Sequence, residues 1–473
     1  MKQVVVIGTV LLVIISCLPA LTATNEKGVP LLLRGSRVYV GGSGPGNYST
    51  IQAAIDNATD GDTVFVYDDS SPYHERIKVT KSLVIVGERQ ETTVIDANGV
   101  SPGGEYAIRL EANNTSLSNF TVLNSEYGVL FSPESWSHIV KEVTFYNITR
   151  PLVLQQTYYN LILNNSMTKT RDTSDPFIGI YLEKTNTCII SNNRIKGYRF
   201  NVTDTGIEIR DSSGDIIQQN FLYNCSLDAL ESEIAKNTFT DNFYNDGPIV
   251  CLKNIALKTI YGAAQIILYQ CEDIIIQYGS FTGQRYAVFI YDSCNCIVQH
   301  CFFRDNSQAI RITGSRQITI ADNYIDNDVY SHLPPDYRMG MVIATTIDSM
   351  VTNNTIINTN LGLYLKNSQH NKITHNLFKE NQGVKIIQDT YDAGGIMVAE
   401  GIWNLILSNT FIRNFPNVLY YDSILNLFLH NYWGWPCLLP KPILGITAPV
   451  PWYPSRLIIT FDLRPALMPL KTT

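Results

Sequence analysis

Four ionisable residues fall in two neighbouring copies of an internal repeat: Glu183, Glu208, Arg210 and Asp211. Carboxylates in such a group can act as a general acid and base, or they can bind calcium through their oxygen atoms. The same residues can form cross-strand ion pairs on a protein surface, with Glu183 beside Arg210. We favour the ion pairs and keep the catalytic role as the alternative. No further feature supports calcium, so no cofactor is expected.

Histidines could bind a metal, and three of the seven, His300, His375 and His430, occupy equivalent positions of a repeat. The stretch GLYLKNSQHNKITHNLF, residues 362–378, also contains His370. The three equivalent histidines lie three and then two repeat copies apart, which separates their Cα atoms by roughly 14 and 10 Å. One metal ion needs its ligand atoms within about 2 Å. The sequence therefore predicts no metal site, and no Met/His-rich tract favours copper.

Cysteines offer two further alternatives. The run CNCIVQHC, residues 294–301, contains metal-ligating residue types but lacks the spacing of a zinc site. The repeat places Cys271 and Cys294 at neighbouring positions of adjacent copies, within reach of a disulfide. The alternative is that both are buried free thiols, and the sequence leaves the choice open.

An internal repeat supplies the elements that position these residues. With Gly362 as position zero, nine gap-free copies begin at residues 151, 179, 206, 287, 309, 340, 362, 395 and 417. Positions 1, 11 and 16 are apolar in every copy, and position 6 is Ser or Thr in eight. Three steps between copies are 22 residues long, and the others are longer through insertions. Position 14 is asparagine in eight copies, with Cys301 in the ninth: Asn165, Asn193, Asn220, Asn323, Asn354, Asn376, Asn409 and Asn431.

The repeat predicts an all-β fold. Each copy holds three short runs of alternating apolar residues separated by turn residues, without a helical pattern. Three strands in about 22 residues are typical of one coil of a right-handed, single-stranded parallel β-helix, here with about 11–13 coils. Positions 1, 3, 11 and 16 would face inwards. The recurring asparagine fits a tight turn, where it tolerates unusual backbone angles and its amide can bond to the next coil.

The ends of the chain differ from the repeat. Residues 1–23 resemble a secretory signal peptide, with a lipoprotein signal to residue 16 and a lipid on Cys17, or a retained membrane anchor, as alternatives. Residues 24–60 form an N-terminal cap with a short helix capped by Ser49. The β-helix then spans residues 61–434, and the Pro/Trp-rich residues 435–473 form a C-terminal cap. Within the β-helix, residues 225–283 fit the repeat less well. Two distorted coils are expected there, one containing ALESEIAKNTF and one containing AQIILYQCEDIIIQYGSF.

Composition narrows the choice of partners. Only 16% of residues are charged and the formal net charge is −7, which gives no reason to expect nucleic acid or an anionic membrane surface as a partner. We expect an exported monomer, secreted or held at the cell surface or in the periplasm.

The segment NYSTIQAAIDNATDGDTVFVYDDSSPYHERIKVTKSLVIVGERQETTVIDANG, residues 47–99, resembles the opening of right-handed β-helix proteins of the NosD and CASH type, the carbohydrate-binding proteins and sugar hydrolases. The repeats are similar to the same group, and the tail resembles the C-terminal caps of uncharacterised exported archaeal members. The resemblance covers almost the whole mature chain. It implies glycan binding or processing at a surface, or the copper-delivery role of NosD in assembling nitrous oxide reductase.

Positions 2 and 4 would form an outward strand face, walled by the insertions at residues 168–178, 196–205, 326–339 and 379–394. Aromatic rings there can stack on sugars, and charged groups can bond sugar hydroxyl or uronate groups. We predict polysaccharide binding along this face; an enzyme would be a polysaccharide lyase or a glycoside hydrolase. A structural or adhesive surface module and a copper accessory protein are the alternatives. Besides the ionisable group above, the face carries Tyr181, Phe289, Tyr291, Arg311, Tyr364 and Lys366.

Overall fold

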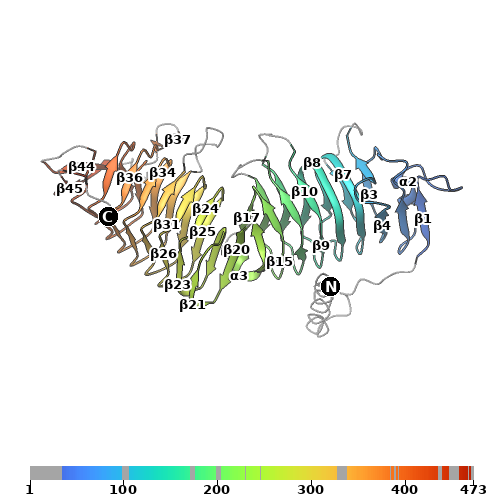
Figure 1. Cartoon of the computed structure of the whole chain (residues 1–473), viewed down its shortest axis with the longest axis horizontal. Helices are drawn as coiled ribbons and strands as arrows, with labels where there is room; N and C mark the ends of the chain where they lie inside the picture. Colours follow the sequence, from blue (N-terminus) through green and yellow to red (C-terminus); the bar gives the residue numbers. More distant parts are fainter. Residues whose placement is uncertain are drawn as a thin grey trace, which may run out of the picture.

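The computed structural model is a parallel β-helix, which confirms the fold expected from the repeat. Successive coils lie side by side from helix α2 at one end to β44 and β45 at the other (Figure 1). Among the residues that the structure describes, no helix is both long and apolar enough to cross a membrane. The described residues are 35–98, 106–170, 176–198, 204–229, 231–245, 247–327, 338–383, 385–387, 390–391, 394–434, 439–446, 457–466 and 468–469.

The expected signal peptide, lipid site at Cys17 and retained anchor all lie outside the described residues, and the boundaries of the expected domains stay predictions. Helix α2 (Ile51–Asn57) lies where a short helix was expected. Its N-cap is Thr50, whose side chain accepts a hydrogen bond from the Ala53 N–H, and not Ser49.

The coils contribute strands to three columns of parallel strands. The first column contains β3 (Ile77–Val79), β6 (Tyr106–Leu110), β11 (Ile178–Glu183), β14 (Thr205–Arg210), β17 (Ser226–Ala229), β20 (Gly247–Lys253), β22 (Gln265–Tyr269), β25 (Tyr286–Tyr291), β28 (Gln308–Thr313), β31 (Met339–Ala344), β34 (Leu361–Lys366), β39 (Ile396–Ala399), β42 (Val418–Tyr421) and β44 (Lys441–Ile446). The long strands β7 (Ser116–Phe131) and β8 (Ile139–Gln155) run through all three columns.

The second column contains β1 (Arg37–Val40), β2 (Thr63–Val66), β4 (Val84–Gly87), β9 (Leu161–Leu163), β12 (Ile189–Ser191), β15 (Ile216–Gln218), β18 (Thr238–Thr240), β21 (Ala256–Ile260), β23 (Glu272–Gln277), β26 (Ile297–Gln299), β29 (Thr319–Ala321), β32 (Met350–Thr352), β35 (Lys372–Thr374), β40 (Leu405–Leu407), β43 (Leu427–Leu429) and β45 (Leu457–Asp462). The third contains β5 (Val94–Asp96), β10 (Ser166–Thr168), β13 (Arg194–Lys196), β16 (Phe221–Tyr223), β19 (Asn242–Tyr244), β24 (Ser280–Thr282), β27 (Phe302–Arg304), β30 (Tyr324–Asp326), β33 (Thr355–Ile357), β36 (Leu377–Lys379) and β41 (Thr410–Ile412). Strands β37 (Lys385–Ile387) and β38 (Thr390–Tyr391) form a separate antiparallel pair.

All three columns are interrupted at the same point of the chain. In the described residues β17, β18 and β19 pair with no strand of the coil that follows, except that β19 pairs antiparallel with β20. We call the described coils before this point, within residues 35–245, the first stack, and those within residues 247–466 the second stack. The coil expected around ALESEIAKNTF does form, because β17, β18 and β19 pair with β14, β15 and β16 of the preceding coil. Its distorted turn is helix α3 (Glu231–Lys236), which lies at the interruption. The other expected coil there also forms, as β22, β23 and β24.

Apolar side chains fill the interior of both stacks. The residues at positions 1, 3, 11 and 16 of the repeat are buried, as expected from their spacing. At position 16 the rings of Phe378, Phe411 and Trp433 stack at centroid distances of 5.3 and 4.7 Å. Alignment of equivalent side chains in neighbouring coils therefore produces continuous apolar columns.

The asparagines of position 14 are buried and connect one coil to the next. The Oδ1 atom of Asn376 accepts hydrogen bonds from the backbone N–H of Asn354, at 2.9 Å, and from its Nδ2, at 3.0 Å. Its Nδ2 donates to Asn409 Oδ1 at 3.0 Å. The same bonds link Asn165, Asn193, Asn220 and Asn242 in the first stack and Asn323, Asn354, Asn376, Asn409 and Asn431 in the second.

The unusual backbone angles lie one residue earlier than expected, at position 13. His300, His375 and His430 have φ values of 52, 58 and 58°, so this histidine column lies at left-handed turn positions. Further hydrogen-bond columns run along positions 6 and 9, for which the repeat analysis predicted no hydrogen bonds. For example, the Thr346 N–H donates to Ser368 Oγ at 3.1 Å, and the Asn371 N–H donates to Asn404 Oδ1 at 3.0 Å.

Replacing Asn376 with alanine should lower the free energy of unfolding by about 3 kcal/mol, because buried donors and acceptors in two neighbouring coils lose their partners. Urea unfolding would measure the change. Lys372→Ala, at an exposed strand position of the same coil, is the control and should shift stability by less than about 0.5 kcal/mol. Equal losses in the two variants would contradict a stabilising role of the column.

Asp215 should make stability depend on pH, because it is fully buried at position 9, where other coils carry asparagine. Burial raises the pKa of its carboxyl group, although hydrogen bonds from Thr185 and Cys188 oppose the shift. A folded-state pKa above the ordinary value of 3.8 favours the protonated form, so stability falls as pH rises through this range. We expect Asp215→Asn to be more stable than the natural protein at pH 7, with a gap that narrows towards pH 4 in thermal unfolding. An Asn variant less stable at pH 7 would disprove this.

Candidate functional site

The two stacks meet at a junction formed by β17, α3, β22, β25 and β28. The apolar core consists of two clusters that follow the two stacks, yet Ile267 of β22 and Phe289 of β25 belong to the first cluster. Both side chains point away from the core of their own stack, since Val288 and Ile290 beside Phe289 belong to the second cluster. The outward face of the second stack thus packs against the end of the first stack (Figure 1).

An ion network connects the stacks at this junction. Parallel pairing of β14 with β17 places Glu208 beside Asp228. Arg210 Nη2 lies 3.0 Å from Glu208 Oε1 and 3.0 Å from Asp228 Oδ2. Arg285, from the second stack, forms an ion pair with the same Asp228 oxygen. Because both carboxylate oxygens are 3.0 Å from one nitrogen, they are at most 3.0 + 3.0 = 6.0 Å apart.

The network changes the acidity of Glu208. Burial raises the pKa of this carboxyl group, and the charge of Asp228 adds to the effect. Arg210 and Arg285 oppose it, but the pKa remains above its ordinary value of 4.5. A carboxyl group with a raised pKa can hold and deliver a proton closer to neutral pH, which is the property of a general acid.

Aromatic rings surround the arginines on the side of the second stack. Arg285 lies over the ring of Tyr286 at 5.6 Å. Arg311 lies 5.7 Å from the ring centroid of Phe289 and forms an ion pair of 3.9 Å with Glu231 of α3. The junction therefore combines guanidinium groups, carboxylates and aromatic faces within one surface.

Several buried oxygens at the junction have no hydrogen-bond partner among the described residues: Asp228 Oδ1, Glu233 Oε2 and Gln265 Oε1. All three are acceptors. Unpaired acceptors in a buried setting favour a ligand or solvent molecule that can donate hydrogen bonds, such as a hydroxyl group.

The predicted ionisable group divides in the structure. Glu208 and Arg210 belong to the junction network, whereas Glu183 lies beside Arg210 in register and accepts a hydrogen bond from Gln155 at 2.7 Å. The ion pairs that the structure shows for Arg210 go to Glu208 and Asp228, so the expected Glu183–Arg210 pair is replaced. Asp211 has φ of 48° in an exposed turn, and its N–H donates to Glu233.

The predicted aromatic face is also only partly assembled at the junction. Phe289, expected to face a glycan, is instead buried against the first stack, so that prediction is wrong. Tyr181 lies next to Glu208 in register, and burial together with Glu183 and Glu208 raises the pKa of its hydroxyl group. Tyr291 stacks on Tyr269 at 5.5 Å. Tyr364 and Lys366 lie on β34, two coils beyond Arg311, and are not part of the junction. About half of the residues in the insertions expected to wall this face lie outside the described residues.

Asp228, Arg285 and Glu231 were missed by the repeat analysis. Pairing between β14 and β17 shifts register between Thr205 and Ile207, so a gap-free template cannot align Asp228 with Glu208. The alternation in SLDA, residues 226–229, was the available signal, because it matches the alternation in GIEIR, residues 206–210.

The cysteines are free thiols in the described residues. The backbone of Cys294 pairs in parallel with that of Glu272, one residue beyond Cys271. Cys271 is buried, whereas Cys294 is half-buried. This register is unfavourable for a disulfide between them, and the pairing stays a prediction.

A match to the sequence model of a protein family shows to which family the chain belongs. The model, described as periplasmic copper-binding protein (NosD), matches residues 55–254 and again residues 246–437. The chain belongs to the NosD family. The two matches overlap at residues 246–254, which include β20 at the start of the second stack.

Solved structures similar to this chain include an alginate lyase, an alginate epimerase and an α-1,3-glucanase. The alginate lyase from Paenibacillus sp. str. FPU-7 has 12% identity and a TM-score of 0.35 over 62% of this chain and 95% of the lyase. A mutant of the periplasmic alginate epimerase AlgG has 12% identity and a TM-score of 0.32 over 82% and 65% of the two chains. The GH87 α-1,3-glucanase from Streptomyces thermodiastaticus strain HF3-3 has 9% identity and a TM-score of 0.35 over 81% and 66%. These similarities carry no argument about function, and no curated protein matches the chain.

The NosD family description names copper, so the side chains of the described residues must be able to bind copper if this chain does. No three His, Cys, Asp or Glu side chains in the described part of the chain are placed to hold one metal ion. Burial raises the pKa of Cys188 to about 12 and that of Cys301 to about 11, which disfavours the thiolate form that binds metal. Burial lowers the pKa of His138 to about 4, which keeps its imidazole in the neutral form that binds metals, but His138 belongs to no group of three donors in the described residues. The described residues therefore do not fit a copper site.

Replacing Asp228 with asparagine should lower the free energy of unfolding by about 2–4 kcal/mol, because Arg210 and Arg285 lose their shared counter-charge. The loss should be near the lower end of the range, since both arginines retain some contact with solvent. Asp211→Asn, in the exposed turn nearby, is the matched control and should be neutral within about 0.5 kcal/mol. Urea unfolding would compare the two, and an equally small change in both would show that the network does not hold the stacks together.

Proposed function

We propose that this NosD-family chain is an exported, monomeric β-helix protein that binds polysaccharide along the outward face of its first strand column. Export is supported by the signal-like residues 1–23 and by the periplasmic description of the family. A lipid on Cys17 or a retained anchor would keep the protein at the membrane. One observation supports the location most strongly, namely that aromatic rings and ionised groups of both stacks come together at the junction.

The chemistry of this surface suits a sugar chain. Tyr269 and Tyr291 form a stacked pair on the outward face, and neither ring is fully buried. Aromatic faces pack against the apolar faces of sugar rings, while charged groups bond to hydroxyl or acidic substituents. A polymer lying along successive coils would meet Tyr291 at the junction and, two coils beyond Arg311, Tyr364 and Lys366.

Glu208 favours processing as a second candidate function. Its raised pKa and its position within 6.0 Å of the Asp228 carboxylate oxygen, from the two 3.0 Å contacts to Arg210, give one acid-capable and one ionised group. A polysaccharide lyase or a glycoside hydrolase would use Glu208 to transfer a proton. Asp228 is buried, so it would act on Glu208 electrostatically and would not contact the sugar.

Two other functions remain as alternatives to polysaccharide binding. A structural or adhesive surface module would use the coils as a stiff rod and would need no ligand at the junction. A copper accessory role would need donors beyond the described residues, since those present do not fit copper.

A glycan array, followed by calorimetric titration of any glycan bound, tests the proposal. Tyr291→Ala should weaken binding about tenfold through loss of ring contact, corresponding to about 1.4 kcal/mol. Tyr159→Ala, at an exposed tyrosine in a different turn, is the control and should bind like the natural protein. Absence of binding to any neutral or acidic glycan would refute the proposed function, as would equal affinity of both variants and the natural protein.

A further inference from the structure

Position 5 of the coils adopts a left-handed backbone in almost every copy, and only one described copy has glycine there. The φ values range from 44° at Asp422 to 62° at Gly314. The residues of this column are Gln156, Lys184, Asp211, Gln270, Asp292, Gly314, Thr345, Asn367, Glu400 and Asp422. Because nine of these ten residues hold the conformation with a side chain, the backbone alone does not require glycine at 314. What distinguishes Gly314 from the other residues of the column is therefore the space left open by its missing side chain.

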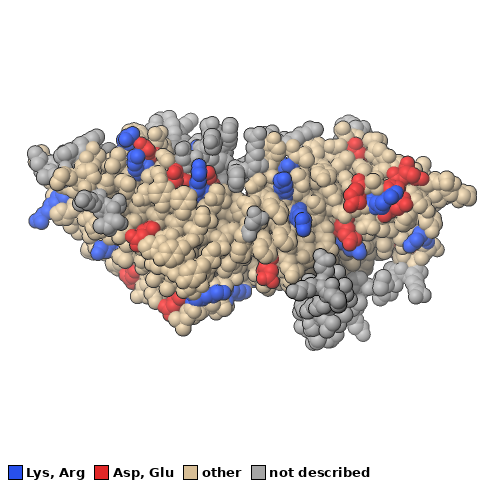
Figure 2. All heavy atoms as spheres, viewed as in Figure 1, with Lys and Arg blue, Asp and Glu red and all other residues tan. Residues whose placement is uncertain are grey.

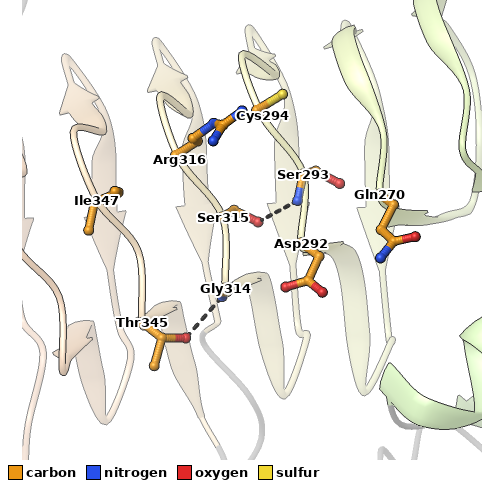
Figure 3. Close-up of a pocket in the computed structure, with 9 residues that line it drawn as sticks. All are labelled: Gln270, Asp292, Ser293, Cys294, Gly314, Ser315, Arg316, Thr345 and Ile347. Carbon is orange, nitrogen blue, oxygen red and sulfur yellow. Dashed lines mark hydrogen bonds between the residues drawn. The ribbon is translucent and has the colours of Figure 1, made fainter.

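A groove with a volume of about 440 Å³ lies beside Gly314. Its lining includes Gln270, Asp292, Gly314, Arg316 and Thr345 (Figure 3). A Cβ atom on Gly314 would lie only 2.4 Å from Asp292 Oδ1 and 3.6 Å from Tyr291 Cε2. Glycine therefore keeps the Asp292 carboxylate open to the groove and leaves the groove next to the ring of Tyr291. Its volume falls within the range of small-molecule sites.

The groove carries polar groups suited to hydroxyls. Asp292 lies beside Gly314, and Arg316 extends towards Cys294 at another edge (Figure 3). Within the described part of the chain neither Asp292 nor Arg316 forms an ion pair, and both are exposed. Thr345 Oγ1 accepts a hydrogen bond from the Gly314 N–H at 3.0 Å, which fixes the turn between the coils. A carboxylate acceptor, a guanidinium donor and the amide of Gln270 thus line the same groove.

The groove also continues the proposed polysaccharide face. Gln270 and Asp292 directly follow Tyr269 and Tyr291, the stacked pair at the end of β22 and β25. A sugar chain in contact with this pair would place a neighbouring residue at the groove.

We infer that the groove around Gly314 is a subsite for one pyranose residue, recognised through hydroxyl groups that donate to Asp292 and accept from Arg316. This inference rests on the proposed polysaccharide binding. It assigns Gly314 a role in ligand size selection, because any larger residue at this position closes the subsite.

Gly314→Asn tests the subsite directly. Asparagine adopts the same left-handed conformation at the same position in Asn367, so the fold should be retained while the new side chain fills the groove. We expect at least a tenfold loss of affinity for the oligosaccharide bound by the natural protein, measured by calorimetric titration. Glu400→Asn places asparagine at the same position two coils beyond Thr345 and should bind normally.

Asp292→Asn is a second test that changes neither shape nor turn conformation. It should weaken binding severalfold by removing the charged acceptor, whereas Asp422→Asn, the same change at the same position of a distant coil, should not. Normal affinity in both Gly314→Asn and Asp292→Asn, with weakened binding in Tyr291→Ala, would overturn the subsite alone. Absence of any glycan binding by the natural protein would overturn both the subsite and the proposed function.

Discussion

The fold depends on pairing the backbone groups of each turn with the next coil. A coil closes through turns whose N–H groups point inwards, where water cannot reach them, and each must find a partner in a neighbouring coil. Asparagine at position 14 provides an acceptor for the backbone of one coil and a donor for the next, as in Asn354, Asn376 and Asn409. Charged surface groups are spread thinly over the face shown in Figure 2, without a large region of one sign. Order along the solenoid therefore comes from buried amides and stacked apolar side chains.

The junction is where this regular pairing stops and an ion network takes over. Strand β17 has no strand of the second stack beside it in the described residues, and Asp228 on that strand instead binds Arg285 across the interruption. The loss of repeat geometry frees side chains such as Glu208, Glu231 and Arg311 to meet aromatic rings. Irregularity and chemical variety occur at the same place, which is why the candidate site lies there.

Much of the fold was predictable from the sequence, because apolar residues and asparagine recur at fixed positions within each coil. Their spacing therefore gives the number of residues in one coil. The left-handed turn was placed one residue late, since asparagine occurs at both positions of Asn353–Asn354 and pattern alone does not distinguish them. Helix α3, with six residues, is too short to leave a helical period in a β-rich sequence. For the site, Glu208 and Arg210 were found because they occupy the outward positions 2 and 4 of one repeat copy. Arg285 was not, because 57 residues separate it from Asp228 and only the irregular packing of the stacks brings them together.

The interruption also bears on self-association. The last strands of a parallel stack expose unpaired N–H and C=O groups, which invite another chain to add a strand. In this protein the first stack ends inside the molecule, where α3 and the outward face of the second stack lie against it. The junction therefore acts as an internal end cap. Placing two stacks end against face in this way lengthens the molecule without adding two more open strand edges to its surface.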